Sequence, residues 1–178
     1  FGFDEFFIAL GYRGEYIKRF FLDYYQLSAD ISFDFANRLI EESDRQVENW
    51  KVHLIDTGLD SMTGGRLKRL QPWLKDNTFM LTYGDGLADV NLSELYRYHQ
   101  QQGCAATVTT VQTVGRVGVV SLGADNRVMS FREKPVQEDG WINGGFFVLE
   151  PEVLERIAGD GTIFEKDPLE SLSAEGQL

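Results

Sequence analysis

Cysteine is nearly absent from this sequence, and long hydrophobic runs are missing altogether. Cys104 is the one cysteine in 178 residues, so no disulfide can form within the chain, which indicates a reducing compartment such as the cytoplasm. No apolar run approaches the length of about 20 residues that a membrane-spanning helix requires. The first residues also lack the basic, apolar and small-residue pattern of a signal peptide. We therefore expect a cytoplasmic protein without a membrane segment.

Positively charged residues are also few compared with negatively charged ones. The chain has 17 Lys and Arg against 28 Asp and Glu, which gives a formal net charge of −11. A surface that acidic repels the phosphates of nucleic acids and of anionic membranes, so neither is expected as a partner. An anionic small molecule is still compatible where cations gather locally. Such places are Arg66, Lys68 and Arg69, then Arg116, and then Arg132 and Lys134.

The remaining composition is that of an ordinary globular protein, and its pattern alternates strands with helices. Hydrophobic residues make up 43% and charged residues 25%, which is a common mixture for a folded domain. This alternation predicts an α/β fold with a mostly parallel or mixed sheet and helices on both faces. Ligands of such sheets bind beyond the carboxyl ends of the strands. Strands are expected at residues 6–10, 31–35, 51–56, 79–83, 104–111, 117–122, 128–132 and 142–149, and helices at 15–25, from 66 onward, 91–103 and 151–159.

The organisation of the chain is simple, because no linker is visible. Residues 1–178 are therefore expected to form a single domain. The chain opens on Phe1 rather than Met and runs at once into the apolar strand at 6–10. It stops soon after a helical segment. We therefore expect this domain to be incomplete at both ends.

Asp85 stands at the end of an apolar strand, between two glycines. Because the strand at 79–83 leads directly into Gly84-Asp85-Gly86, the carboxylate lies at the carboxyl edge of the predicted sheet. The glycines allow a bulky ligand to approach the backbone. Phosphoryl and nucleotidyl transfer use a hard cation held by one or two carboxylates and by phosphate oxygens. Asp and Gly are also ordinary turn residues, and spacing alone slightly favours a plain turn.

The loop at 56–66 is the second candidate site. It is rich in Thr, Ser and Gly and leads into a basic helix. The free N–H groups and the dipole of a helix N-terminus attract anions, and Arg66 adds a forked cation that suits phosphate oxygens. The alternative is an ordinary loop in which Ser61 or Thr63 caps the helix.

The same loop also contains Asp56-Thr57-Gly58, the nucleophile motif of aspartic proteases. We rank this alternative low for three reasons. The motif occurs once, Leu59 follows it where a small or hydroxyl residue is usual, and the alternation of strands and helices does not suit an all-β protease.

Three further segments are candidates for contact with a ligand, and the first of them suits a sugar phosphate. Glu133 and Lys134 follow a strand directly before Pro135, so an acceptor for hydroxyls stands beside a cation for phosphate. Asn143-Gly144-Gly145 lies within a strand, where glycines indicate either a bulge or the close approach of a ligand. The segment at 115–120, which contains Gly118, has a similar pattern. Taken alone, the Glu-Lys pair is more typical of a solvated charge pair.

Taken in order along nearly the whole chain, these motifs become more specific. They are Gly11-Tyr12-Arg13-Gly14, Asp56-Thr57-Gly58, Met62-Thr63-Gly64-Gly65-Arg66-Leu67-Lys68-Arg69, Thr82-Tyr83-Gly84-Asp85-Gly86, Glu133-Lys134-Pro135 and Asn143-Gly144-Gly145-Phe146-Phe147. The series resembles the sugar-1-phosphate nucleotidyltransferases, and the stretch from Met62 to Arg69 is its most distinctive part.

The resemblance implies a Rossmann-like α/β fold and a reaction. A sugar 1-phosphate attacks the α-phosphate of a nucleoside triphosphate and releases pyrophosphate, with Mg²⁺ as the cofactor. The implied substrates are CTP and glucose 1-phosphate, and the implied product is CDP-glucose, a precursor of deoxysugars in cell-surface polysaccharide such as the lipopolysaccharide O-antigen. The resemblance also implies a homo-oligomer for the full-length protein.

The resemblance further implies roles for individual residues. Asp85 would bind Mg²⁺, Arg66 the nucleotide phosphates and Lys134 the sugar phosphate, and these three form the implied catalytic set. The implied nucleotide-binding residues are Ser61, Thr63, Gly64, Gly65 and Arg66. The implied residues for the sugar phosphate are Gly118, Glu133, Lys134, Asn143 and Gly144.

Two features of that family are not found in these 178 residues. One is the Gly-rich loop Gly-Gly-x-Gly-Thr-Arg with a following Lys, and the other is a second metal-binding Asp near the carboxyl end. We therefore expect residues 1–178 by themselves not to catalyse the reaction. The alternatives are a relative that uses dTTP, UTP or GTP, and a noncatalytic protein that binds a nucleotide sugar.

Overall fold

The structure of the chain is a computed structural model that describes residues 1–44, 47–114, 119–122, 128–132 and 136–178. These residues form two compact units. Unit 1 comprises Phe1–Asn77 and Pro151–Glu175, and unit 2 comprises Thr78–Glu150 and Gly176–Leu178. The single domain that the sequence predicts for residues 1–178 stays a prediction.

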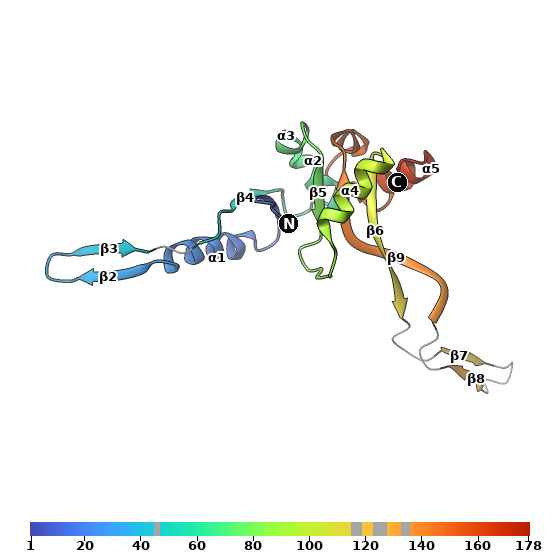
Figure 1. Cartoon of the computed structure of the whole chain (residues 1–178), viewed down its shortest axis with the longest axis horizontal. Helices are drawn as coiled ribbons and strands as arrows, with labels where there is room; N and C mark the ends of the chain where they lie inside the picture. The colour runs from blue at the N-terminus through green and yellow to red at the C-terminus, as the bar shows by residue number, and fades with distance from the viewer. Residues whose placement is uncertain (45–46, 115–118, 123–127, 133–135) are drawn as a thin grey trace. The chain divides into compact units, whose positions relative to one another are not determined.

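Unit 1 contains a pair of parallel strands, β1 and β4, that end side by side with Leu10 opposite Asp56. A separate antiparallel hairpin, β2 and β3, follows helix α1 (Figure 1). The elements of this unit are β1 (Glu5–Leu10), α1 (Gly14–Leu27), β2 (Asp30–Asp34), β3 (Leu39–Ser43), β4 (Lys51–Asp56), α2 (Thr63–Arg69), α3 (Gln71–Leu74), the 3₁₀ helix η1 (Pro151–Arg156) and α5 (Asp167–Ala174).

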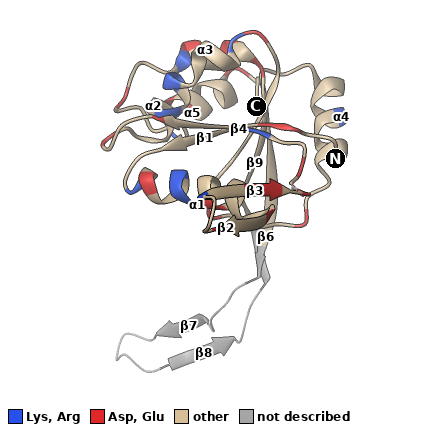
Figure 2. Ribbon diagram, turned by 90° about the vertical axis from the view of Figure 1, so that its left-hand side faces the viewer, with Lys and Arg blue, Asp and Glu red and all other residues tan. Residues whose placement is uncertain are grey.

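The core of unit 1 forms around the basic helix that the sequence predicts near Arg66. Leu67, Leu70 and Leu74 are all buried, as their spacing predicts. They share the core with fully buried residues from the C-terminal part of the chain, among them Leu154 and Leu172. Figure 2 shows the basic positions of α2 in blue. Arg66 and Lys68 are half-buried and Arg69 is exposed, and Lys68 Nζ donates to the carbonyl oxygen of Leu154 at 2.8 Å.

The spacing of Ile17, Phe20, Phe21 and Tyr24 predicts one apolar face on helix α1, and most of that face is exposed. Phe20 is 60% exposed and Tyr24 39% exposed. Residues four apart lie on the same side of a helix, and here their rings pack against one another, with the centroids of Phe20 and Tyr24 6.1 Å apart. Gly14 is the buried residue of this helix.

Unit 2 is built on a three-stranded antiparallel sheet in the order β5, β9, β6. Phe147, Val148 and Leu149 of the central strand are completely buried. Helix α4 begins as predicted, because the N–H of Glu94 donates to Oδ1 of Asn91 at 3.2 Å, and it ends at Gly103. The elements are β5 (Phe79–Thr82), α4 (Leu92–Gln102), β6 (Ala106–Val114), β9 (Val136–Leu149) and a second hairpin of β7 (Val119–Leu122) and β8 (Val128–Arg132).

The predicted α/β class is confirmed, and the strand pairing is mixed. Among the described strands, β1 and β4 pair in parallel and the other pairs are antiparallel. The helix expected at 151–159 is instead a six-residue 3₁₀ helix, and the strand β3 was not predicted. No helix within the described part of the chain has the length and apolar character needed to cross a membrane.

Candidate functional site

The loop after β4 is fastened to the end of β1. Both the N–H and the hydroxyl of Thr57 donate to the carbonyl oxygen of Leu10, each at 2.8 Å. The N–H of Gly58 donates to Oδ1 of Asp56 at 2.9 Å, and the hydroxyl of Ser61 donates to the carbonyl oxygen of Thr57. Thr57 and Ser61 are buried. The predicted nucleotide residue Ser61 therefore stabilises the loop from within, at the carboxyl ends of two parallel strands.

Arg66, the predicted phosphate ligand, reaches back under this loop. Its Nη1 donates to the carbonyl oxygen of Leu10 at 3.1 Å, to Oγ1 of Thr57 at 2.9 Å and to the carbonyl oxygen of Gly58 at 3.1 Å. A Cβ at Gly11 would lie 2.4 Å from the same nitrogen, so this glycine makes room for the guanidinium. The geometry gives Arg66 a bracing role between the strand ends, and its predicted contact with phosphate stays a prediction.

The Arg66→Lys variant separates these two roles. Lysine keeps the positive charge but cannot reproduce the planar fork of donors. We expect the free energy of unfolding in urea to fall by about 2 kcal/mol, because a partly buried set of charged hydrogen bonds is lost. The matched variant Arg19→Lys, on the exposed side of α1, should change it by less than about 0.5 kcal/mol. Unchanged stability with weaker CTP binding would favour the phosphate role instead.

The N-terminus of α2 is covered by the segment at 160–165. The N–H of Met62 donates to the carbonyl oxygen of Asp160 at 2.9 Å, and that of Gly65 donates to the carbonyl oxygen of Thr162 at 3.2 Å. The hydroxyl of Thr63 donates to Glu165 Oε2 at 2.6 Å and accepts from the N–H of Phe164 at 2.9 Å. Two of the helix-terminal N–H groups that the sequence offers to an anion are therefore used within the chain.

The two glycines of this helix start are needed for that contact. A Cβ at Gly64 would lie 2.8 Å from the carbonyl oxygen of Thr162, and one at Gly65 would lie 2.2 Å from that of Asp160. The family resemblance implies that both glycines bind the nucleotide. The structure supplies a second reason, because the 160–162 backbone itself comes this close.

An ion pair fixes the same contact at the other end of α2. Arg69 donates from Nε to Oδ1 of Asp160 at 2.8 Å and from Nη2 to Oδ2 at 2.6 Å. This forked hydrogen bonding lowers the pKa of the Asp160 carboxyl and raises the pKa of the Arg69 guanidinium. The sequence predicts Arg69 as part of a local group of cations. It does not indicate that Asp160, 91 positions away, is the partner.

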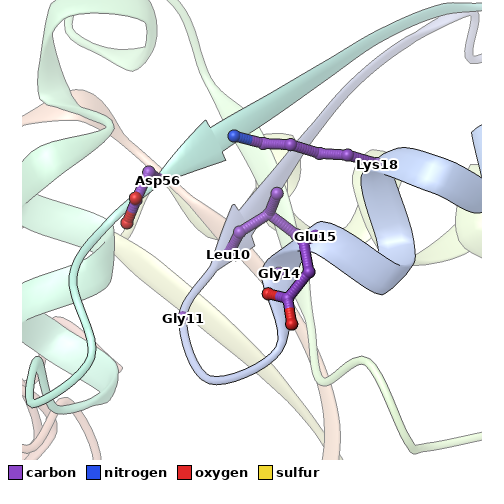
Figure 3. A pocket seen from close by; sticks show the side chains of 6 residues that line it. All are labelled: Leu10, Gly11, Gly14, Glu15, Lys18 and Asp56. Carbon is purple, nitrogen blue, oxygen red and sulfur yellow. The ribbon is translucent and has the colours of Figure 1, made fainter.

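A small open pocket of about 170 Å³ lies where β1 and β4 end. It is lined by Leu10, Gly11 and Gly14 and by three charged residues, Glu15, Lys18 and Asp56 (Figure 3). Carboxylates and an ammonium group around one hollow can bind hydroxyl and amine groups of a small polar molecule. Sequence analysis did not select Glu15 or Lys18, although their spacing of three residues at a helix start places them on one face.

In unit 2, the segments that carry Asp85 and the predicted sugar residues Asn143 and Gly144 adjoin the same end of the sheet. Strand β5 pairs with β9 so that Thr82 lies opposite Phe146, and both sites therefore follow or precede the same end of the sheet. Asp85 and Asn143 are exposed. Tyr83, two positions before Asp85, contacts Asn143, since Nδ2 of Asn143 donates to the Tyr83 hydroxyl at 3.0 Å. Tyr83 belongs to the motif Thr82-Tyr83-Gly84-Asp85-Gly86, but the sequence pattern indicates no role for it.

The predicted sugar-phosphate site lies only partly within the described residues. Gly118, Glu133 and Lys134 lie outside the described residues. Within the described ranges, no group of three or more His, Cys, Asp or Glu could hold a metal ion. Asp85 alone still fits Mg²⁺ as a single oxygen ligand, because that ion is commonly held by one or two carboxylates, by water and by substrate phosphates.

Comparison with known proteins decides the family. The family model described as nucleotidyl transferase matches residues 62–176. The chain is 42% identical to glucose-1-phosphate cytidylyltransferase of Salmonella typhimurium over 178 residues, which cover 99% of this chain and 69% of the relative. The same identity holds for the probable glucose-1-phosphate cytidylyltransferase of Bacillus subtilis, over 100% of this chain and 69% of the relative. The chain belongs to the nucleotidyl transferase family.

Solved structures agree with this membership at the level of the fold. The structure of HddC from Yersinia pseudotuberculosis superposes with a TM-score of 0.58 at 20% identity, and the match covers 93% of this chain and 64% of that one. UDP-glucose pyrophosphorylase in complex with UDP-glucose gives a TM-score of 0.53 at 15% identity over 98% of this chain and 71% of that one. At these identities the likeness concerns the nucleotidyl transferase fold alone.

Proposed function

We propose that the protein transfers the cytidylyl group of CTP to glucose 1-phosphate, giving CDP-glucose and pyrophosphate. The observation that carries this proposal is 42% identity over 99% of the chain to a glucose-1-phosphate cytidylyltransferase. The order of motifs along the chain supports it, and so does the exposure of Asp85 and Asn143 in segments that adjoin the same end of a sheet.

The reaction needs no covalent intermediate on the protein. A phosphate oxygen of glucose 1-phosphate attacks the α-phosphorus of CTP, a P–O bond forms, and the bond to the β-phosphate breaks as pyrophosphate leaves. The protein contributes alignment and stabilisation of charge. Mg²⁺ bound at Asp85 would neutralise the negative charge of the phosphates.

The proposed roles divide between the two units. In unit 1, the loop from Ser61 to Gly65 holds the nucleotide and Arg66 contacts its phosphates, while Arg66 also fixes the preceding residues Thr57 and Gly58. In unit 2, Asn143 and Gly144 contact the sugar. Lys134, Glu133 and Gly118 keep the roles that the family resemblance implies, as part of this proposal. The inactivity expected of residues 1–178 by themselves stays a prediction.

Substrate use and metal dependence test the proposal together. In the protein as its gene encodes it, pyrophosphate release should be at least about tenfold more efficient in kcat/KM with CTP than with UTP, dTTP or GTP, because a polar site built for one base leaves buried groups unpaired with another. Excess EDTA should lower the rate by more than about 100-fold, and excess Mg²⁺ should restore it.

Two other results would redirect the proposal. Preference for UTP, dTTP or GTP would keep nucleotidyl transfer and change the base, and the relatives include a UTP--glucose-1-phosphate uridylyltransferase at 28% identity over 88% of this chain. Binding of CDP-glucose without any pyrophosphate release would indicate a noncatalytic nucleotide-sugar-binding protein.

The cellular setting forms a further part of the proposal. We propose a cytoplasmic enzyme, supported by its lone Cys104 and by the cytoplasmic supply of CTP and sugar phosphates. Its product would enter deoxysugar synthesis for O-antigen. The acidic net charge of −11 argues against nucleic acid and anionic membranes as partners. A homo-oligomer is proposed for the full-length protein, and analytical ultracentrifugation would test it.

A further inference from the structure

Tyr83 connects the strand end that leads to Asp85 with the segment that carries Asn143. Nδ2 of Asn143 donates to the hydroxyl oxygen of Tyr83 at 3.0 Å. At the other end of the same side chain, Oδ1 of Asn143 accepts from the N–H of Gly145 at 2.8 Å. The amide plane of Asn143 is thus held at both ends, although the side chain itself is exposed.

The ring of Tyr83 is itself fixed in place. It lies edge-on to the fully buried Phe147, with the centroids 6.1 Å apart and the planes at 82°. The ring also packs closely against Gly145, where a Cβ would lie 2.9 Å from Cδ2 of the ring. Gly145 also has a φ of +79°, which a side chain would disfavour. Packing against Phe147 and Gly145 therefore positions the Tyr83 hydroxyl for its contact with Asn143.

An amide held in this way can select its ligand. A carboxamide has two N–H donors and an acceptor oxygen with two lone pairs. The bond to Tyr83 uses one N–H of the Asn143 amide, and the bond from Gly145 uses one lone pair of its oxygen. The other N–H and the other lone pair can bind neighbouring hydroxyls of a sugar. The two bonds also fix the amide before a ligand arrives. Binding then costs less entropy than it would with an amide that is free to flip.

We propose that Tyr83 is a positioning residue for the sugar, acting through the amide of Asn143. This inference rests on the proposed function, because it concerns the sugar part of CDP-glucose. The Tyr83 hydroxyl orients the Asn143 amide, and the phenyl part of Tyr83 maintains the end of β5 that precedes Asp85. The first contribution requires the hydroxyl group and the second requires the ring. Substitution by Phe therefore removes the first and keeps the second.

The Tyr83→Phe variant removes the hydroxyl and keeps the ring. In the protein as its gene encodes it, we expect the Kd for CDP-glucose, measured by calorimetry, to rise about tenfold, which corresponds to about 1.4 kcal/mol. The Kd for CTP should stay within about twofold, because CTP lacks the glucosyl group that Asn143 is proposed to contact. The matched variant Tyr98→Phe, at a 54% exposed position on α4, should leave both values unchanged.

A double-substitution comparison excludes a general structural effect. If Tyr83 acts through Asn143, then Tyr83→Phe combined with Asn143→Ala should bind CDP-glucose no more weakly than Asn143→Ala alone. Additive losses, an unchanged Kd in Tyr83→Phe, or equal losses for CDP-glucose and CTP would each overturn the inference.

A second readout keeps the inference distinct from the proposed function. The side-chain amide signals of Asn143 in a ¹⁵N-correlated NMR spectrum should shift in Tyr83→Phe without any ligand. If the wild-type protein neither binds CDP-glucose nor releases pyrophosphate, the proposed function fails, and with it the sugar role of Tyr83. If the wild-type protein does both but the Asn143 signals and the Kd are the same in Tyr83→Phe, the inference about Tyr83 alone fails.

Discussion

Replacing Asp85 with asparagine is expected to lower the turnover of CTP and glucose 1-phosphate by about 10³-fold or more. Asparagine keeps the shape and removes the negative charge that would bind Mg²⁺, and loss of metal-based charge stabilisation costs several kcal/mol in the transition state. Turnover is measured as pyrophosphate release at saturating Mg²⁺ by the protein as its gene encodes it. Because Asp85 is exposed, the thermal unfolding midpoint should stay within about 2 °C of wild type.

A neighbouring carboxylate provides the control for Asp85. Asp89 is also exposed and lies in the same loop after β5, so Asp89→Asn makes the same change in charge four positions away. We expect it to keep at least about half of the wild-type turnover. Full activity of Asp85→Asn, or an equal loss in both variants, would contradict a specific metal-binding role for Asp85.

Gly65→Ala is expected to give the largest loss of stability among single substitutions in α2. Its Cβ would lie 2.2 Å from the carbonyl oxygen of Asp160, 2.6 Å from Cα and 2.7 Å from the carbonyl carbon of the same residue. All three are backbone atoms, so no flexible side chain can move aside. We expect the free energy of unfolding in urea to fall by about 3 kcal/mol, the upper range for overpacking.

The control for Gly65 comes from the segment that it contacts. A Cβ at Gly161 would meet nothing within 4 Å, so Gly161→Ala should change the free energy of unfolding by less than about 1 kcal/mol, and in either direction. The opposite result would be an unchanged midpoint of urea unfolding in Gly65→Ala together with weaker CTP binding. That result would show that the glycine is needed for nucleotide binding rather than for the contact with residues 160–162.

This packing changes how the most distinctive motif of the chain is understood. Met62 and Gly65 use their N–H groups on the 160–162 backbone, and Arg66 braces the ends of β1 and β4. The motif therefore gives the loop its shape through contacts with distant parts of unit 1. In the proposed function, nucleotide binding depends on that shape.

Local sequence patterns were sufficient to predict much of the fold. The spacing of Leu67, Leu70 and Leu74 predicts their burial, and Asn91 with Glu94 predicts the start of α4. These features depend on residues within one or two turns, so the sequence contains all the information needed. The exposed apolar face of α1 is different, because burial requires a partner surface that no local pattern specifies.

The sequence by itself determined the α/β class, the family resemblance and the choice of Asp85 at a strand end as the candidate metal ligand. Only the tertiary structure decided that Asp160 meets Gly65 and Arg69, and that Tyr83 holds Asn143 sixty positions away. The physical reason is that helix and strand periods are local properties of the chain. Contacts between distant segments depend instead on strand register and packing, which fix the atoms that come within hydrogen-bonding distance.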